Sequence, residues 1–497
     1  MNTSIIRYII GHIIKIEGFF MFLPCVIAII FHEKELFTYL AVAIVCILLG
    51  SLITIKKAKD SVFYLKEGCI ATALSWFLLS FFGALPFVIT EEIPSFTDAM
   101  FETVSGFTTT GASILTNVEA LSHTSLFWRS FTHWIGGMGV LVFLLAIVPL
   151  SGGSNINLMR AESTGTSVGK LVPKVSYSAR ILYIIYLSLT IIELVLLLIA
   201  KMPWFDALCI SIGTAGTGGF GILNTSCASY SVTAQWIITI FMILFSINFN
   251  AFYLILFGQI KQALKMEEVR AFLAIVLIAI VLITHDISGM FDSLFEATTY
   301  ASFQVASIIS STGFATIDFD LWPGFSKTLL VLLMFIGACA GSTGGGIKVS
   351  RFVIMWKAIR RELNSYIHPK SVKKIVMDGK ELEFGVARSV GIYLITFFAI
   401  FVFSILVIAH DEKDFITNFT AVAATLNNIG PGLAMVGPTQ NFAHFTDLSK
   451  WVFIFDMMAG RLELFPLLIM FHPSIWHELI VRTIRRKIRE KNGGQIL

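Results

Sequence analysis

Four short motifs centred on glycine recur along the chain, and their residue types suit the coordination of a cation by backbone oxygens. A hydroxyl or amide residue stands two positions before each glycine, and a small residue stands six positions before it. Glycine permits the backbone geometry that turns successive carbonyl groups toward one axis, and rings of such oxygens can replace the hydration shell of an alkali cation. The pattern therefore predicts a potassium-binding filter formed by Thr109, Thr110, Gly111, Thr217, Gly218, Gly219, Ser311, Thr312, Gly313, Asn428, Ile429 and Gly430.

The elements that would position these motifs are short helices. A single motif could equally be a turn or a glycine that lets two helices pack, but four copies at equivalent places in the chain weaken that alternative. The stretch of about a dozen residues before each glycine is compatible with a helix that is too short to cross a bilayer. Non-helical backbone at membrane depth is tolerated where it is buried in protein or lines a wet cavity. We therefore expect four re-entrant helices, each followed by a pore loop, whose C-terminal dipoles favour a cation.

The composition indicates that the chain folds in a membrane. Hydrophobic residues make up 56% of its 497 residues, charged residues make up 14%, and the mean hydropathy is +0.82. These values exclude a soluble globular class. The six cysteines show no CxxC spacing and most lie in apolar runs, so we expect neither a disulfide framework nor any metal site except one for potassium.

Apolar segments of about 20 residues, the length that crosses a bilayer, recur along the whole chain. They lie near residues 8–32, 36–56, 67–90, 124–150, 180–201, 233–258, 268–287, 325–357, 386–409 and 448–472. From the third segment onward they form pairs, and a semi-polar stretch with one glycine motif separates the members of each pair. The predicted fold is an all-α polytopic membrane protein of about ten transmembrane helices, with four pseudo-symmetric helix/pore-loop/helix repeats and two extra N-terminal helices.

This organisation divides the chain into six parts. They are two N-terminal transmembrane helices (1–60), pore-loop repeat 1 (61–165), repeat 2 (166–265), repeat 3 with an intramembrane gating loop (266–375), repeat 4 (376–474) and a basic cytoplasmic tail (475–497). Lys and Arg concentrate between the repeats and in the tail, whereas the stretches inside the repeats carry acids such as Glu91 and Asp98. This asymmetry predicts that both termini are cytoplasmic. The tail could serve either as an anchor to anionic lipid or as a site for a partner.

One glycine-rich stretch interrupts the second helix of repeat 3. Its composition is incompatible with a rigid helix, and we interpret it as a flexible gate below the filter; a simple hinge is the alternative. The predicted gate comprises Gly341, Ser342, Thr343, Gly344, Gly345, Gly346 and Lys348. For the similar cluster Gly136, Gly137 and Gly139 in repeat 1, a packing or hinge role is favoured.

A single arginine, Arg461, lies near the centre of the last apolar segment. A charge there costs about 2.5 to 3.5 kcal/mol on insertion scales, so it must face water or a partner. Facing the pore, it would repel cations and act as a barrier. The alternative is a structural ion pair with Asp456, Glu463 or Glu102.

The four glycine motifs, the loop 341–346 and the segment 459–463 together resemble the Trk/Ktr/HKT superfamily of potassium transporters, and the two N-terminal helices make the chain most similar to the TrkH type. The resemblance implies that Gly111, Gly219, Gly313 and Gly430 are filter glycines and that Arg461 is the pore arginine. A serine at the position of Gly111 goes with sodium transport in the plant branch, so glycine there implies potassium. The second and fourth motifs depart from Thr-Thr-Gly, which suggests a looser filter.

The resemblance also implies partners and a location. It implies a homodimer with one pore per protomer in the bacterial inner membrane, and a cytosolic TrkA-type nucleotide-binding regulatory protein that senses NAD, ATP or ADP. We expect no cofactor bound by this chain, with potassium as the transported ion, and no nucleic-acid partner.

The favoured function is potassium uptake through a single central pore gated on the cytosolic side. The runner-up is a potassium/proton or potassium/sodium symporter with the same architecture. An enzyme is disfavoured because the sequence contains no HExxH, no GxSxG and no paired intramembrane Asp motif.

Overall fold

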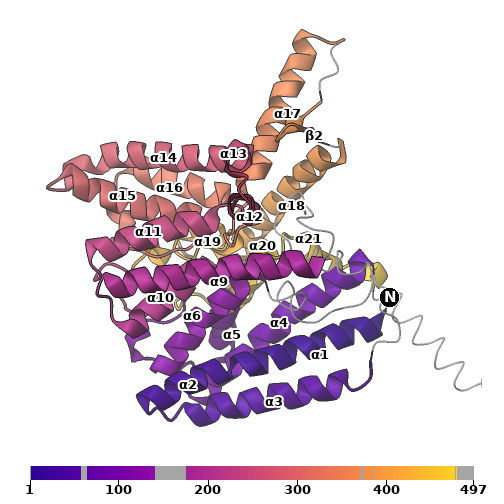
Figure 1. The fold of residues 1–497 in the computed structure, drawn as a ribbon, viewed down its shortest axis with the longest axis vertical. Coiled ribbons are helices and arrows are strands. Elements are labelled where there is room, and N and C mark those ends of the chain that lie inside the picture. The colour runs from indigo at the N-terminus through magenta and orange to yellow at the C-terminus, as the bar shows by residue number, and fades with distance from the viewer. Residues whose placement is uncertain are drawn as a thin grey trace, which may run out of the picture.

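A computed structural model of the chain describes residues 2–57, 64–139, 175–370, 374–382, 384–475 and 477 (Figure 1). The predicted basic tail after residue 477 and the basic link within 140–174 lie outside the described residues.

Long apolar helices dominate the described fold, and many of them run side by side in Figure 1. Those long and apolar enough to cross a membrane are Thr3–Phe31 (α1, Thr3–Phe20, and α2, Phe22–Phe31), Leu36–Thr54 (α3), Leu65–Ile89 (α4), Ala179–Ile199 (within α9, Val175–Ile199), Glu267–Met290 (α14, Glu267–Ile287, and a short 3-10 turn) and Gly385–Asp411 (within α18, Phe384–Ile408, and the 3-10 turn after it). The prediction of an all-α polytopic membrane protein is confirmed.

The second helix of each repeat is broken or ends early within the described residues, which explains why fewer than ten segments span by length alone. In repeat 2 the two pieces meet at an angle of 93°. The pieces are α6 (His123–Met138) in repeat 1, α11 (Val232–Ser246) and α12 (Phe249–Leu256) in repeat 2, α16 (Gly324–Ile336) and α17 (Val349–Ile367) in repeat 3, and α20 (Asp447–Arg461) and α21 (Phe465–Met470) in repeat 4.

Four short helices precede the glycine motifs, as the sequence predicts. They are α5 (Phe96–Phe107), α10 (Trp204–Gly216), α15 (Leu294–Ile309) and α19 (Phe415–Leu426). Side chains of Ser95, Ser293 and Asp414 cap the first, third and fourth of them. At 1.5 Å per residue each is roughly 18 to 24 Å long and cannot cross about 30 Å of hydrocarbon.

A small β-hairpin follows α17 and is absent from the sequence-based prediction. Strands β1 (Val376–Met377) and β2 (Lys380–Glu381) pair antiparallel around the turn residues Asp378 and Gly379. Both turn residues have positive φ, at 51° and 75°. Asp-Gly is the sequence signal for this tight turn, since both positions favour left-handed backbone. In Figure 1 the hairpin and α17 lie at the edge of the helical body, from which α17 projects.

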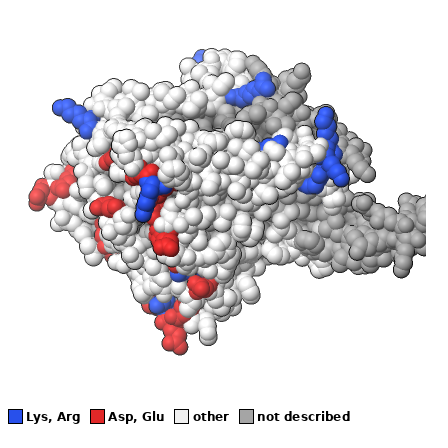
Figure 2. Space-filling view, turned by 90° about the horizontal axis from the view of Figure 1, so that it is seen from below, with Lys and Arg blue, Asp and Glu red and all other residues white. Residues whose placement is uncertain are grey.

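Charge is distributed unevenly over the visible face of the molecule. In Figure 2, acidic residues gather toward the left end, whereas Lys and Arg predominate toward the right end, where Figure 1 places the N-terminus. This separation agrees with the expected asymmetry of Lys and Arg. The orientation of the termini itself stays a prediction.

The hydrophobic core joins the N-terminal helices to repeats 1 and 4, with Trp76 and Trp128 fully buried in it. Helices α1 and α3 approach closely because glycines face each other: a Cβ on Gly50 would lie 2.6 Å from the carbonyl oxygen of Gly11. A second core lies in repeat 3 and extends to Ile429 and Leu433 of repeat 4.

A carboxylate between α2 and α3 fastens the N-terminal pair to repeat 1. Glu33 accepts hydrogen bonds from the backbone N–H groups of His123 and Thr124, at 2.8 and 2.9 Å, and from the Thr124 hydroxyl at 2.6 Å. Partial burial raises the pKa of the Glu33 carboxyl, but the hydrogen bonds from Thr124 and His123 outweigh it, and the pKa lies below its usual value. These bonds satisfy N–H groups at the start of α6 that have no partner within that helix.

The lowered pKa of Glu33 predicts a pH-dependent contribution to stability. It is present above about pH 4.3, the usual value for unfolded Glu, and is lost as the pH falls through the lower folded value. We expect Glu33→Gln to lower the melting temperature at pH 7 by about 2 °C in detergent. The difference from wild type should shrink below about pH 4. Exposed Glu362→Gln is the control, and an equal effect of both substitutions would contradict the assignment.

Candidate functional site

The four short helices end in the same pattern of backbone hydrogen bonds. In each, the N–H of the residue before the motif glycine donates to the carbonyl of the small residue six positions before that glycine. The distances are 2.8 Å for Thr110 to Ser105, 2.9 Å for Gly218 to Gly213, 2.9 Å for Thr312 to Ser307 and 2.8 Å for Ile429 to Ala424. With the accompanying bond from the residue two before the glycine, this is a Schellman ending. It satisfies carbonyl groups that a helix end otherwise leaves unpaired.

The backbone beyond each ending follows one repeated conformation. The residue two before the glycine has a positive φ in all four repeats, between 52° and 61°, and so does the glycine, between 79° and 95°. For Thr109 and Thr217, which are β-branched, a positive φ is unusual and strained. Such strain persists only where surrounding structure holds the backbone, and it is typical of functional sites.

The motif glycines pack against neighbouring loops in cyclic order. A Cβ on Gly111 would overlap the carbonyl oxygen of Gly218, one on Gly219 that of Thr312, and one on Gly313 that of Ile429. A Cβ on Gly430 would lie 2.7 Å from the carbonyl oxygen of Thr110, which closes the ring. All twelve predicted filter residues therefore belong to four loops that meet in one ring.

A cavity of about 190 Å³ opens on one face of this ring. All four motif glycines line it, together with residues that follow them, such as Ala112, Phe220 and Pro431, and with Arg129.

His133 explains why the second motif carries glycine before its central glycine. A Cβ on Gly218 would overlap the His133 ring, so a threonine cannot occupy this position. The ring links two repeats: its Nδ1 lies 2.7 Å from the carbonyl oxygen of Gly106, and its Nε2 accepts from the Phe220 N–H at 3.2 Å. Because Nε2 accepts, Nδ1 must carry the proton and donate.

An amide side chain links repeats 4 and 1 at another junction of the ring. Asn428 Nδ2 donates to Thr110 Oγ1 at 2.9 Å and to the Met457 carbonyl at 2.8 Å. An aliphatic side chain could make neither bond.

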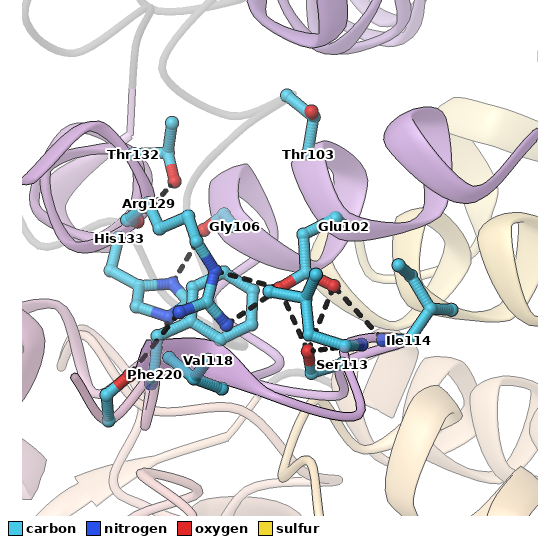
Figure 3. Close-up of polar contacts among 12 residues, drawn as sticks. Glu102, Thr103, Gly106, Ser113, Ile114, Val118, Arg129, Thr132, His133 and Phe220 are labelled. Carbon is cyan, nitrogen blue, oxygen red and sulfur yellow. Dashed lines mark hydrogen bonds and ion pairs between the residues drawn. The ribbon is translucent and has the colours of Figure 1, made fainter. Parts of the chain in front are cut away.

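A buried ion pair braces the loops of repeats 1 and 2, and Figure 3 shows its contacts. Arg129 Nη2 and Nε lie 2.6 and 2.8 Å from Glu102 Oε1, and the guanidinium lies 4.0 Å from the centre of the Phe220 ring. The Glu102 carboxylate also accepts from Ser113 Oγ and from the Ile114 N–H, at 3.0 and 3.1 Å. The pair therefore fixes the chain just after the glycine in both loops.

Arg129 is not predicted from the sequence, in which Glu102 is a candidate only as a partner for Arg461. The three acids considered for Arg461 instead have other contacts. Glu102 pairs with Arg129, Glu463 pairs with Arg351, and Asp456 accepts from Ser404 at 2.7 Å.

Arg461 itself donates to backbone carbonyls of two other repeats. Its Nη1 donates to Thr343 at 2.7 Å, and its Nη2 donates to Gly137 at 2.8 Å and also to Gly136. Such hydrogen bonds from a charged donor are stronger than neutral ones. A Cβ on Gly136 would overlap the Phe107 carbonyl, so the predicted packing role of this glycine agrees with the structure.

The glycine-rich stretch 341–346 is non-helical, as predicted, and is bonded to several repeats. The Gly345 N–H donates to Ser311 Oγ at 2.5 Å, and the Gly346 N–H donates to the Asn427 carbonyl at 3.0 Å. The Thr343 hydroxyl donates to the Phe245 carbonyl at 3.1 Å. These contacts lie on the side of the ring where the short helices end, which we call the helix side. The cavity opens on the other side. Lys348 is 2% exposed and donates to the Gly344 carbonyl, while the flexibility of the stretch stays a prediction.

Comparison with known proteins gives consistent matches. The sequence matches the TrkH family, described as a cation transport protein, over residues 35–478. It is 35% identical to the Trk system potassium uptake protein TrkH of Salmonella typhimurium and 34% identical to TrkG of Escherichia coli; each match covers 96% of this chain and 100% of the relative. The crystal structure of the potassium transporter TrkH from Vibrio parahaemolyticus superposes with a TM-score of 0.86 at 32% identity, covering 96% and 100% of the two chains.

The buried pair of Glu102 and Arg129 predicts a strong effect of removing one partner. Glu102→Gln leaves a buried cation without its anion, which should lower the free energy of unfolding by about 3 kcal/mol. Combining it with Arg129→Met should recover part of the loss, because no unpaired charge remains. Thermal unfolding in detergent measures both. Exposed Glu381→Gln is the control, and wild-type stability of Glu102→Gln would refute the bracing role.

Proposed function

The chain belongs to the TrkH family of cation transport proteins, and from this premise we propose that it takes up potassium through the ring formed by its four loops. The family is one of transporters rather than enzymes, and the chain is a multi-pass membrane protein. The observation that carries the proposal is the cyclic closure at Gly111, Gly219, Gly313 and Gly430.

The ring offers a potassium ion three kinds of favourable interaction. Backbone carbonyls of the motifs replace water oxygens. The C-termini of α5, α10, α15 and α19 contribute partial negative charge, roughly half an elementary charge each before screening. Among the described residues, buried oxygens of Thr109, Asn427 and Asn428 also lack a hydrogen-bond partner, as suits groups beside an ion or water.

Discrimination is expected to be weaker than in a filter of four identical loops. Hydroxyl pairs stiffen repeats 1 and 3: Thr110 lies 2.8 Å from Thr108, and Thr312 lies 2.6 Å from Ser310, between their oxygens. Gly218 and Ile429 have no hydroxyl at the matching positions. We propose that the two loops without a hydroxyl pair let the ring adapt its shape and so lower its discrimination between ions.

The proposed gate consists of the stretch 341–346 and Arg461. Both occupy the helix side of the ring, so an ion leaving the ring must displace them. Opening would break the bonds from Arg461 to Thr343 and Gly137 and the bond from Gly346 to Asn427. Closure is thus supported by several hydrogen bonds, of which those from Arg461 have a charged donor, and water replaces each of them on opening.

The proposed setting is a bacterial inner membrane with both termini cytoplasmic. The relatives' names place them in a Trk system, which supports a multi-component assembly. We propose a homodimer regulated by a cytosolic TrkA-type protein that senses NAD, ATP or ADP, while this chain binds no nucleotide or other cofactor itself.

Rubidium flux into proteoliposomes tests the ring. Gly111→Ser places a side chain on the Gly218 carbonyl in a backbone region of positive φ, so flux should fall at least about tenfold or lose its preference over sodium. Gly324→Ser is the matched control, because a Cβ there meets nothing within 4 Å. Unchanged flux and selectivity in Gly111→Ser would show that the ring is not the filter.

The same assay tests the barrier. Arg461→Ala removes a positive charge and the bond to Thr343, so rubidium flux should rise about tenfold, the effect of roughly 1.4 kcal/mol on a barrier. Arg270 is exposed, so Arg270→Ala is the control for loss of a positive charge, and its rubidium flux should match that of wild type. If Arg461→Ala folds but conducts no faster than Arg270→Ala, Arg461 has a packing role alone.

A further inference from the structure

Glu268, in the first turn of α14, holds both flanks of the stretch 341–346. Its Oε1 accepts from the Ala340 N–H at 2.6 Å and from the Ser350 N–H at 3.1 Å. Ala340 directly precedes the stretch, and Ser350 lies in the first turn of α17, whose N-cap residue makes no side-chain cap bond. Glu268 is buried, with 4% of the residue exposed. It therefore caps α17 from another helix and ties that cap to the start of the proposed gate.

The neighbouring residue, Glu267, is bonded to the β-hairpin. Its N–H donates to Asp378 Oδ1 at 2.7 Å, and its Oε1 accepts from the Asp378 N–H at 3.1 Å. Its carboxylate also pairs with Lys357 of α17, whose Nζ donates to the Val376 carbonyl at 2.6 Å. A hairpin with two residues per strand has little stability of its own. Its position therefore depends on these contacts.

From these contacts we propose that Glu267 and Glu268 couple the hairpin 376–381 to the stretch 341–346, so that moving the hairpin loosens the gate. The inference rests on the proposed function in one respect, which is that the stretch 341–346 acts as the gate. The two glutamates are consecutive in one rigid helix, and consecutive helical side chains point about 100° apart. One carboxylate can thus engage the hairpin while the other engages the stretch. A displacement of this helix end moves both sets of bonds together.

The turn residue Asp378 offers a substitution that removes one of the bonds to Glu267 without straining the turn. Asp378→Gly suits the positive φ of this position and removes Oδ1, whereas Asp378→Asn keeps an oxygen there. Glu381→Ala is the matched control. It removes one negative charge from the same hairpin, and its ion pair is with Lys374 at 2.6 Å.

Hydrogen–deuterium exchange on the full chain in nanodiscs tests the coupling without requiring transport. Amides in peptides covering 338–350 should exchange about tenfold faster in Asp378→Gly than in wild type, whereas Asp378→Asn and Glu381→Ala should match wild type. Equal exchange in Asp378→Gly and Glu381→Ala would overturn the proposal.

A double substitution shows whether Glu268 and Asp378 affect the stretch 341–346 through one shared route or through two separate routes. Glu268→Ala should accelerate exchange of the same peptides, and adding Asp378→Gly should accelerate it no further, because the route is already cut. If the acceleration factors of the two substitutions multiplied in the double variant, the proposal would be overturned. Rubidium flux separates this from the proposed function: if wild type transports no rubidium, potassium uptake fails as a function while the exchange result still decides the coupling.

Discussion

Backbone polar groups at membrane depth need partners within the protein, and this constraint governs the centre of the molecule. Four helices end there, and each ends with two carbonyl groups already satisfied by the Schellman pattern. The backbone can then continue in an extended loop without orphaned helix ends. Glycine closes the ring because Gly111, Gly219 and Gly313 each meet a neighbouring carbonyl where a side chain would stand. On the basis of this arrangement we propose that the loops coordinate a cation.

The ring is repeated in its backbone but not in its side chains. The His133 ring of repeat 1 occupies the space that a side chain at Gly218 of repeat 2 would need, and Asn428 of repeat 4 reaches across to repeat 1. The pair of Glu102 and Arg129 braces the cavity side of two loops. On the helix side, repeat 3 supplies the glycine-rich stretch and repeat 4 supplies Arg461. In the proposed function, all four repeats select the ion, while repeats 3 and 4 control its exit.

The sequence predicts the features that are local or repeated. Four glycine motifs and four short helices are repeated, and the break in the second helix of repeat 3 follows from its glycine-rich composition. Contacts between distant residues could not be predicted. Arg129 is 27 residues from Glu102, Glu268 is 72 residues from Ala340, and Arg461 bonds to backbone carbonyls, which no residue type marks. The hairpin had a local signal in Asp378 and Gly379. Repeat boundaries, orientation and partners stay predictions.

Locating the ion is the most direct test of the central claim. Thallium ions substitute chemically for potassium and scatter X-rays anomalously, so crystals grown with thallium reveal where the ion binds. We predict an anomalous peak inside the ring, within coordination distance of motif backbone oxygens from all four repeats. If crystals grown at a saturating thallium concentration gave no peak in the ring, or a peak only outside it, the account would be contradicted.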